Sequence, residues 1–170
     1  MQNPLLLMTD LPPFGAIKPE HVEPAIDNVL AENRAGVERL LASGGGYGWD
    51  SLVAPLEALD DRLNRIWSPV SHMNSVVNNP ELREAYEACL PRLSDYSTEM
   101  GQNERLYQAF ESIRESDEYR GLNAAQRKVI DNTLRDFRLS GVALPGEQKA
   151  RYKELKLSLI HISEPTRLRR

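Results

Sequence analysis

The sequence predicts an all-α fold made of kinked, antiparallel helices, with no sheet. Apolar residues recur at steps of three and four through most of the chain, as on the buried face of a helix. Asparagine and proline stand where several of these segments begin, and both are favoured at helix starts. Sustained apolar-polar alternation between hairpin turns, which would indicate strands, is missing from the sequence. A chain of 170 residues can form one domain or part of a larger one.

Charge and cysteine content limit the class of protein. The formal net charge is -4 and the signs are interspersed, so the basic face of a nucleic-acid-binding protein is not expected. Cys89 is the single cysteine and cannot form an internal disulfide, which favours a reducing compartment. The first residues lack the basic segment of a signal peptide, and no apolar run reaches the roughly 18 residues that cross a bilayer. We expect a cytoplasmic protein with neither nucleic acid nor membrane as a partner.

Residues 1–18 are expected to form an extended arm. Prolines and a glycine interrupt backbone hydrogen bonding in this stretch. Apolar side chains along the arm can lie over a core, so we expect the arm to be packed. These side chains are Leu5, Leu6, Leu7, Leu11 and Phe14.

A first helix is predicted from residue 19 to about residue 42. Pro19 suits a first helical turn, and Glu20 lies at the positive end of the helix dipole. The glycine-rich stretch 43–48 ends this helix, because consecutive glycines lose too much backbone entropy to stay helical. No Lys-Ser or Lys-Thr pair follows the glycines, so we interpret them as a loop and not as a phosphate-binding site.

Asp50 is expected to cap a second helix with an apolar seam. Ser68-Pro69 interrupts the seam, which favours a packing edge within the chain over a dimeric coiled coil. Because proline lacks a backbone donor, we expect a kink or break at Ser68-Pro69 and a short helical piece to about Val77. The seam consists of Leu52, Leu56, Leu59, Leu63, Ile66 and Val70.

Asn79 and Pro80 suit the cap and the first position of a third helix. Pro91 lies inside this helix and predicts a bend at about residues 87–91.

The rest of the chain is predicted to form further helices between short breaks. The breaks are expected at residues 101–103 and 140–141, and a helix cap is expected at Asn123. A last helix opens at Pro145 and is still running at Leu155.

Several short stretches carry a resemblance to a known family. They are residues 11–14, 17–21, 68–72, 79–86, 131–132, 134–137 and 139–141. In their order and spacing they resemble the amino-terminal region of the oligopeptidase A group of the thimet oligopeptidase family, which are zinc metallopeptidases. Trp67 and Met73 stand where Phe and Leu are expected in that family. The resemblance covers about residues 3–155.

The resemblance implies that residues 19–156 are the helical amino-terminal region, an incomplete lobe, of a cytoplasmic zinc-dependent oligopeptidase. Such an enzyme hydrolyses short peptides in a deep channel between two helical lobes, and these helices would form part of the channel wall. The zinc and its ligands would belong to the missing catalytic lobe of the same chain. We therefore expect this chain to be inactive by itself and to have no cofactor of its own.

A zinc peptidase of this family would use His-Glu-x-x-His on a helix. Residues four apart bring both imidazoles to one ion, and the glutamate activates the metal-bound water. The three histidines are His21, His72 and His161, and none has another histidine three to five positions away. We therefore expect no catalytic, cofactor-binding or metal-binding residue in this chain.

Two histidines need a structural interpretation. His21 lies in a first helical turn, where capping or surface hydrogen bonding is expected. His72 is interpreted as a buried side chain that forms structural hydrogen bonds at the kink. The alternative is a substrate-facing or acid-base role. Its expected partners are Ser71, Asn74 or Ser75.

Other reactive or aromatic residues also favour a structural interpretation. Cys89 has apolar helical neighbours and is expected to be an inert core thiol. Ser68, Ser71 and Ser75 lack the Gly-x-Ser-x-Gly elbow of a hydrolase. Aromatic residues at helical spacing favour a core over a ligand-stacking platform. They are Tyr86, Tyr96, Tyr107, Phe110 and Phe137.

Residues 157–170 resemble a translated sequencing adapter. Residues 157–167 read Leu-Ser-Leu-Ile-His-Ile-Ser-Glu-Pro-Thr-Arg, which the transposon-end and primer adapter used in making sequencing libraries encodes codon by codon. We therefore expect a non-native tail that begins after Lys156.

A second hypothesis comes from a different functional class. The chain would be a free-standing helical interaction module whose seam, from Leu52 to Val70, docks a partner helix. A self-contained module should end its last helix with a cap.

Overall fold

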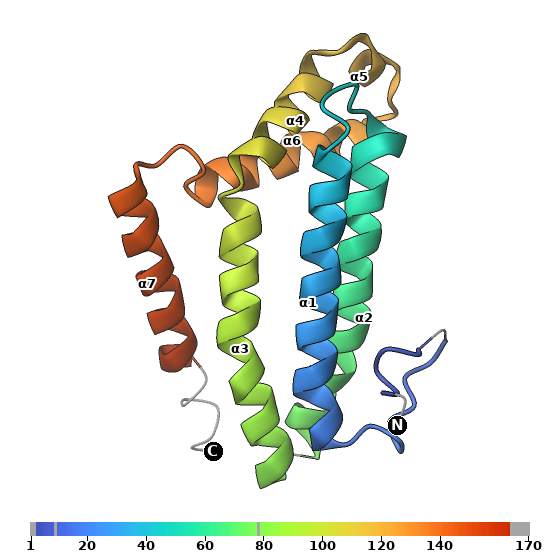
Figure 1. The fold of residues 1–170 in the computed structure, drawn as a ribbon, viewed down its shortest axis with the longest axis vertical. Helices are drawn as coiled ribbons and strands as arrows, with labels where there is room; N and C mark the ends of the chain where they lie inside the picture. Colours follow the sequence, from blue (N-terminus) through green and yellow to red (C-terminus); the bar gives the residue numbers. More distant parts are fainter. Residues whose placement is uncertain (1–2, 9, 78, 164–170) are drawn as a thin grey trace. The chain divides into compact units, whose positions relative to one another are not determined.

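The structure is a computed structural model that describes residues 3–8, 10–77 and 79–163. Within these ranges it contains seven α-helices, one π-helical turn and no strand (Figure 1). The predicted all-α class is confirmed. Among the described helices, none is both long and apolar enough to span a bilayer. The elements are α1 (Pro19–Leu41), η1 (Trp49–Val53), α2 (Ala54–Val76), α3 (Pro80–Gly101), α4 (Glu104–Glu115), α5 (Asp117–Gly121), α6 (Ala124–Leu139) and α7 (Gly146–Ser163).

The chain divides into two compact units. The first unit comprises Met1–Glu38 and Leu56–Arg92, and the second comprises Arg39–Pro55 and Leu93–Arg170. Most of α1 and α2 belongs to the first unit, together with the first half of α3. The second unit contains η1, the end of α3 and helices α4 to α7.

In the first unit, α1, α2 and the beginning of α3 lie side by side (Figure 1). The amide of Asn33 in α1 donates to the Leu59 carbonyl of α2 over 3.1 Å. Trp67 of α2 stacks on Tyr86 of α3, with ring centroids 4.8 Å apart and planes at 13°. The core between these helices is apolar and includes Val22, Ile26, Val29, Ile66, Val70 and Leu82.

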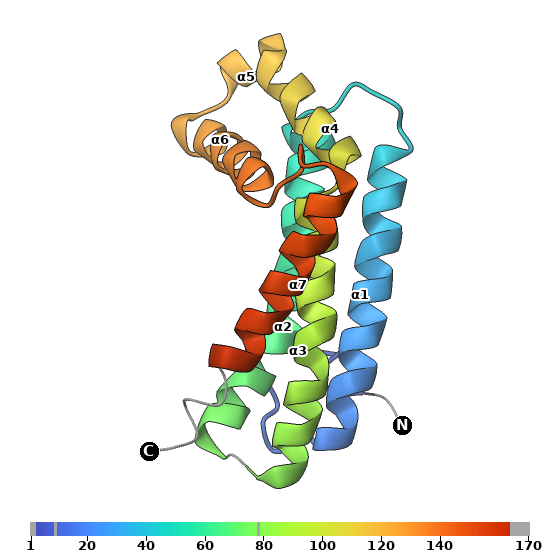
Figure 2. The ribbon, with the colours of Figure 1, turned by 90° about the vertical axis from the view of Figure 1, so that its left-hand side faces the viewer.

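In the second unit, α4 packs against α6. The ring of Phe137 lies 5.8 Å from that of Phe110 and 5.9 Å from that of Tyr107. Helix α7 runs alongside the end of α3, where Lys153 pairs with Asp95 over 3.1 Å (Figure 2). The buried residues of α4 and α6 are Leu106, Ala109, Phe110, Ile113, Ile130, Leu134 and Phe137.

The predicted caps at Asn79 and Asn123 are confirmed. The Asn79 side-chain oxygen accepts from the Leu82 backbone N–H over 2.8 Å. The Asn123 side-chain oxygen accepts from the Gln126 N–H over 2.9 Å, and the Gln126 side chain accepts in return from the Asn123 N–H. Both residues thereby satisfy backbone donors that have no partner inside the helix.

The predicted cap at Asp50 is wrong. Asp50 lies inside η1, and the preceding Gly48 N–H donates to the Ser51 hydroxyl over 2.9 Å. The Trp49 N–H donates to a carboxylate oxygen of Glu118 over 2.9 Å. The Leu52 and Val53 N–H groups, which an Asp50 cap would have satisfied, donate to the Gly48 carbonyl over 3.0 and 3.4 Å instead.

The prediction at Ser68-Pro69 was a kink or a break, and the break is wrong, because α2 continues through both residues to Val76. Pro69 removes one backbone donor, so the Arg65 carbonyl loses its usual helical partner. Pro69 is nevertheless buried, together with Ile66 and Val70 on the same side of the helix. We attribute the continuity of α2 to this packing, which compensates for one missing hydrogen bond.

Candidate functional site

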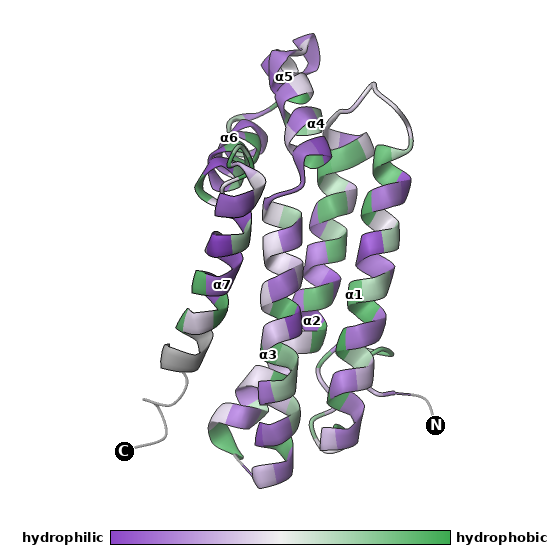
Figure 3. Cartoon of the chain, turned by 60° about the vertical axis from the view of Figure 1, so that its left-hand side comes forward, coloured by the Kyte–Doolittle hydropathy of each residue, from purple (hydrophilic) through white to green (hydrophobic). Residues whose placement is uncertain are grey.

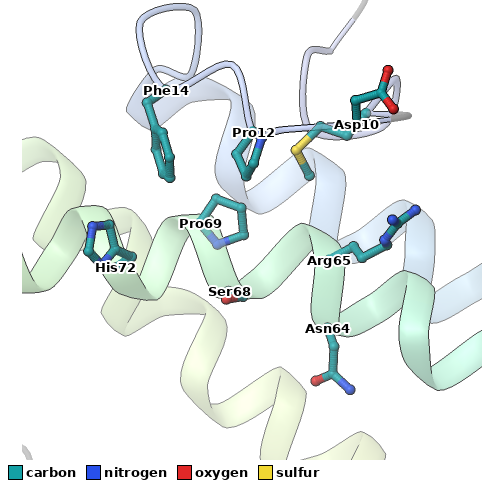
Figure 4. Close-up of a pocket in the computed structure, with 9 residues that line it drawn as sticks. Asp10, Pro12, Phe14, Asn64, Arg65, Ser68, Pro69 and His72 are labelled. Atoms are coloured by element: carbon teal, nitrogen blue, oxygen red, sulfur yellow. The ribbon is translucent and has the colours of Figure 1, made fainter.

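A groove of about 590 Å³ lies in the first unit, between the arm and one side of α2 (Figure 4). Pro12 and Phe14 reach from the arm towards Pro69 and His72 of α2. A smaller hollow of about 240 Å³ shares Met8 and Arg65 with this groove. The lining residues are Met8, Asp10, Pro12, Phe14, Asn64, Arg65, Ser68, Pro69 and His72.

Two buried side chains hold the arm that forms one wall of the groove. Leu5 is 1% exposed and Ile17 is 5% exposed, so both ends of the arm are anchored. The Asn3 amide donates to the His21 carbonyl over 2.8 Å, and its oxygen accepts from the Leu5 N–H over 3.0 Å. The arm is therefore packed at its ends and forms turns between them.

The middle of the arm departs from the prediction. Leu7, Leu11 and Phe14 were expected to lie over a core, but they are 54%, 89% and 45% exposed. Leu11 and Phe14 lie beside or within a turn around Pro12 and Pro13, where the Phe14 and Ala16 N–H groups donate to these proline carbonyls over 2.9 and 2.8 Å. The sequence showed which side chains were apolar but not which way the turn pointed.

His72 is not the buried, hydrogen-bonding residue that was predicted. It is exposed, and no hydrogen bond joins it to another residue in the described ranges. The expected partner Ser75 donates to the Ser71 carbonyl over 3.0 Å instead. Because α2 does not break at Pro69, its backbone has no freed ends for His72 to satisfy.

His21 has the expected structural role. Its Nδ1 accepts from the Lys18 backbone N–H over 3.0 Å, just before α1 begins. This bond caps a backbone donor at the helix start. Its Nε2 lies 4.0 Å from a carboxylate oxygen of Glu20.

Cys89 lies in the core of the first unit and is fully buried. Burial, with the nearby carboxylates of Glu23 and Asp27, raises the pKa of its thiol to about 11, although Arg92 acts in the opposite direction. A thiol with so high a pKa stays protonated at neutral pH and is a weak nucleophile. The geometry therefore favours the inert core thiol.

The aromatic residues at helical spacing are mostly core residues. Tyr86, Tyr96, Phe110 and Phe137 are each at most 8% exposed. The Tyr86 ring stacks on Trp67 and the Phe110 and Phe137 rings pack on one another, while Tyr96 is 5% exposed, so these four residues offer little open ring surface to a ligand.

The residues that the structure describes do not fit a zinc ion. In the part of the chain that the structure describes, no three His, Cys, Asp or Glu side chains are grouped so that they could hold a metal ion. The side chain of His161 lies outside the described residues. The catalytic zinc site of a peptidase needs three converging protein ligands, and no such set can be assigned among the described residues.

The groove itself was not predicted from the sequence. Asn64, Ser68 and His72 follow one another at steps of four along α2, which places them near one side of the helix. This spacing was the available signal for one wall. The other wall comes from the arm, whose turn brings Asp10 and Phe14 to α2 from more than 50 positions away, and no local pattern encodes that approach.

Comparison with known proteins identifies the family. Residues 26–149 match the family model described as Neurolysin/Thimet oligopeptidase, N-terminal domain. The chain belongs to this family. The α2 wall of the groove lies within the matched residues of the oligopeptidase N-terminal domain, whereas the arm precedes them.

Relatives of this oligopeptidase domain are much longer proteins. Oligopeptidase A of Salmonella typhimurium is 56% identical over 159 residues, which cover 94% of this chain and 23% of that protein. Oligopeptidase A of Haemophilus influenzae is 47% identical over 163 residues, or 96% of this chain and 24% of that protein. Probable cytosolic oligopeptidase A of Arabidopsis thaliana is 33% identical over 161 residues, which cover 95% of this chain and 23% of that protein. The chain spans about a quarter of the length of these relatives.

Proposed function

We propose that this chain is the amino-terminal helical part of a cytoplasmic zinc-dependent oligopeptidase that hydrolyses short peptides. The observation that supports this proposal most strongly is the similarity to Oligopeptidase A of Salmonella typhimurium, 56% identical over 94% of this chain. That stretch is only 23% of the relative, so most of the enzyme would be formed by residues outside this chain.

In this proposal the helices form part of the wall of the substrate channel and take no part in bond cleavage. Two features support a structural role. The described residues contain no metal-ligand cluster, and the buried Cys89 thiol is protonated at neutral pH. When bound in the complete enzyme, zinc would supply Lewis-acid activation of water, and residues of the missing catalytic lobe would hold it.

The alternative, a free-standing interaction module, would use the seam on α2 to dock a partner helix. Leu52 in η1 and Ile66 and Val70 in α2 are at most 3% exposed, whereas Leu56, Leu59 and Leu63 of the same seam are half-buried. A partner helix could reach the first three only if the chain unfolded locally. The buried half of the seam therefore counts against the module.

A chimeric enzyme tests the proposal. Residues 1–156 are joined to the part of the Salmonella relative that follows the matched region, and cleavage of a quenched fluorescent peptide is measured with and without a zinc chelator. We expect chelator-sensitive cleavage by the chimera and none by the 170-residue chain alone. Zinc-dependent cleavage by the chain alone, or a folded chimera that never cleaves, would contradict the proposal.

A further inference from the structure

We infer that part of α7 is a detachable strap, which leaves α3 and α4 at high ionic strength while the rest of the second unit stays folded. The strap, as we call it, comprises residues 149–156 of α7. This inference goes beyond the proposed function, because it rests only on contacts within the second unit.

Helix α7 lacks the apolar anchor that its neighbours have. Helices α4 and α6 bury apolar side chains against each other, among them Phe110 and Phe137. The structure describes the side chains of residues 146–159 of α7, and none of these is buried. Packing of an apolar face supplies most of the stability of a helix in a protein. The docking of α7 therefore depends mainly on other contacts.

The partly covered side of α7 is mostly polar. Its half-buried residues follow one another at steps of three and four, which places them on one side of the helix. Leu155 and Leu159 are 51% and 61% exposed, so hydrophilic and hydrophobic residues are interspersed along α7 and these leucines join no core (Figure 3). The half-buried residues are Lys149, Tyr152 and Lys156, with Leu157 beside the last.

Two lysines fix the ends of the strap. The Lys149 ammonium lies 2.5 Å from a carboxylate oxygen of Glu104, at the start of α4. The Lys156 ammonium donates to the Ser97 hydroxyl of α3 over 3.3 Å. The first of these contacts is an ion pair whose glutamate is 66% exposed, so dissolved ions reach it and weaken it.

Lys153 neutralises a buried oxygen in the middle of the strap. Its ammonium lies 3.1 Å from Oδ1 of Asp95 in α3, and this oxygen is not accessible to water. A buried carboxylate oxygen without a nearby cation is costly. Loss of the Lys153 charge should therefore weaken docking more than loss of an ordinary surface charge.

The chain is anchored between α6 and the strap. Val142 is 2% exposed, and its N–H donates to the Phe137 carbonyl over 3.1 Å. This anchor lies before α7 begins, so the strap can leave without disturbing α6. Once released, a helix of 18 residues without a packed face is only marginally stable in water, and its backbone amides become open to exchange.

Hydrogen exchange at two salt concentrations tests the inference. Exchange of the 170-residue chain is followed by mass spectrometry at about 0.01 M and about 1 M sodium chloride, where the screening length falls from about 30 Å to about 3 Å. Rates are corrected with an unstructured peptide of the same sequence as the strap. We expect amides of residues 149–156 to exchange about threefold or more faster at high salt, and amides of α4 and α6 to change less than about twofold.

A matched pair of variants separates docking from helix stability. Lys153→Gln removes the charge that faces Asp95, and at low salt it should speed exchange of the strap about threefold. Arg151→Gln is the control, because Arg151 pairs with Glu154 of the same helix over 2.8 Å and not with α3. It should speed exchange less than about twofold and should leave the salt response of the strap in place.

Three outcomes would overturn the inference. Equal exchange of the strap at both salt concentrations would show that charge does not hold it. Faster exchange of α4 and α6 together with the strap would show that the second unit opens as a whole. Equal acceleration by Lys153→Gln and Arg151→Gln would show that the contact with Asp95 has no special part in docking.

Discussion

The rings of Phe14 and His72 lie 5.8 Å apart at an angle of 53°. This contact joins the arm to α2 across the groove, and the imidazole makes it without being buried. His72 therefore contacts the arm through its ring and does not form hydrogen bonds at a broken helix.

Replacing His72 should have a small effect on stability. Because its side chain is exposed and has no hydrogen-bond partner among the described residues, His72→Ala should lower the free energy of unfolding by less than about 1 kcal/mol. Urea denaturation measures this change. Asn79→Ala is the comparison, since loss of that cap should cost about 1 kcal/mol. A loss of about 2 kcal/mol or more for His72→Ala would indicate the buried hydrogen-bonding role instead.

Arg92 ties α3 to α1 with an ion-pair cluster that should depend on salt. Its Nη1 lies 3.0 Å from both carboxylate oxygens of Asp27, and its Nη2 lies 2.6 Å from Glu23. The Arg92 side chain is 37% exposed, so water and salt screen the cluster. Arg92→Lys loses the forked geometry and should destabilise the chain by about 0.5–1 kcal/mol at low salt, and by less than half of that at about 1 M salt. An equal loss at both salt concentrations would show that packing, not charge, accounts for the effect.

Cys89 should give the chain a pH dependence in the alkaline range. Burial raises the pKa of its thiol from the ordinary 9.0 to about 11. Below pH 9 the thiol is protonated in both states, and between about pH 9 and pH 11 the unfolded chain loses this proton while the folded chain keeps it. The stabilising contribution is therefore complete below pH 9 and is lost as the pH rises towards 11.

The matched variant for this prediction is Cys89→Ala, which lacks the titrating group. Thermal denaturation between pH 8 and pH 11 should show the wild-type chain losing stability more steeply than Cys89→Ala. Parallel curves would mean that the thiol titrates with the same pKa in both states.

Residues 157–170 should contribute little to the stability of the second unit. Three polar contacts that hold α7 come before residue 157: Lys149 pairs with Glu104 over 2.5 Å, Lys153 with Asp95 over 3.1 Å, and Lys156 donates to Ser97 over 3.3 Å. A chain ending at Lys156 should therefore keep its thermal midpoint within about 2 °C. As a control, a chain ending before Lys149 should unfold at a lower temperature. A large loss on removing only residues 157–170 would contradict the expectation of a non-native tail.

Local signals explain what could be predicted from the sequence. The caps at Asn79 and Asn123 depend on side chains that bond to a backbone group three residues away, and helical periodicity indicated the apolar faces. The failures concern partners that are distant in sequence. The helical turn η1 begins at Trp49, whose N–H donates to Glu118, 69 positions away, and no local pattern showed that the turn would start before Asp50.

The same limit applies to the groove and to Pro69. A proline in a helical pattern predicts a break from local chemistry, yet the burial of Ile66, Pro69 and Val70 against the rest of the first unit keeps α2 continuous. The exposure of Leu11 depends on the direction of a proline turn, which residue types alone do not determine. Short α5 has five residues and gives too little periodicity to be recognised.

Sequencing the source DNA across codons 150–170 and onward tests the central claim most directly. If the chain is the amino-terminal part of a zinc oligopeptidase, the genomic frame should depart from the adapter-like sequence near codon 156. It should then continue into a region that encodes His-Glu-x-x-His. An uninterrupted genomic frame through the same tail, followed at once by a stop codon, would contradict the account.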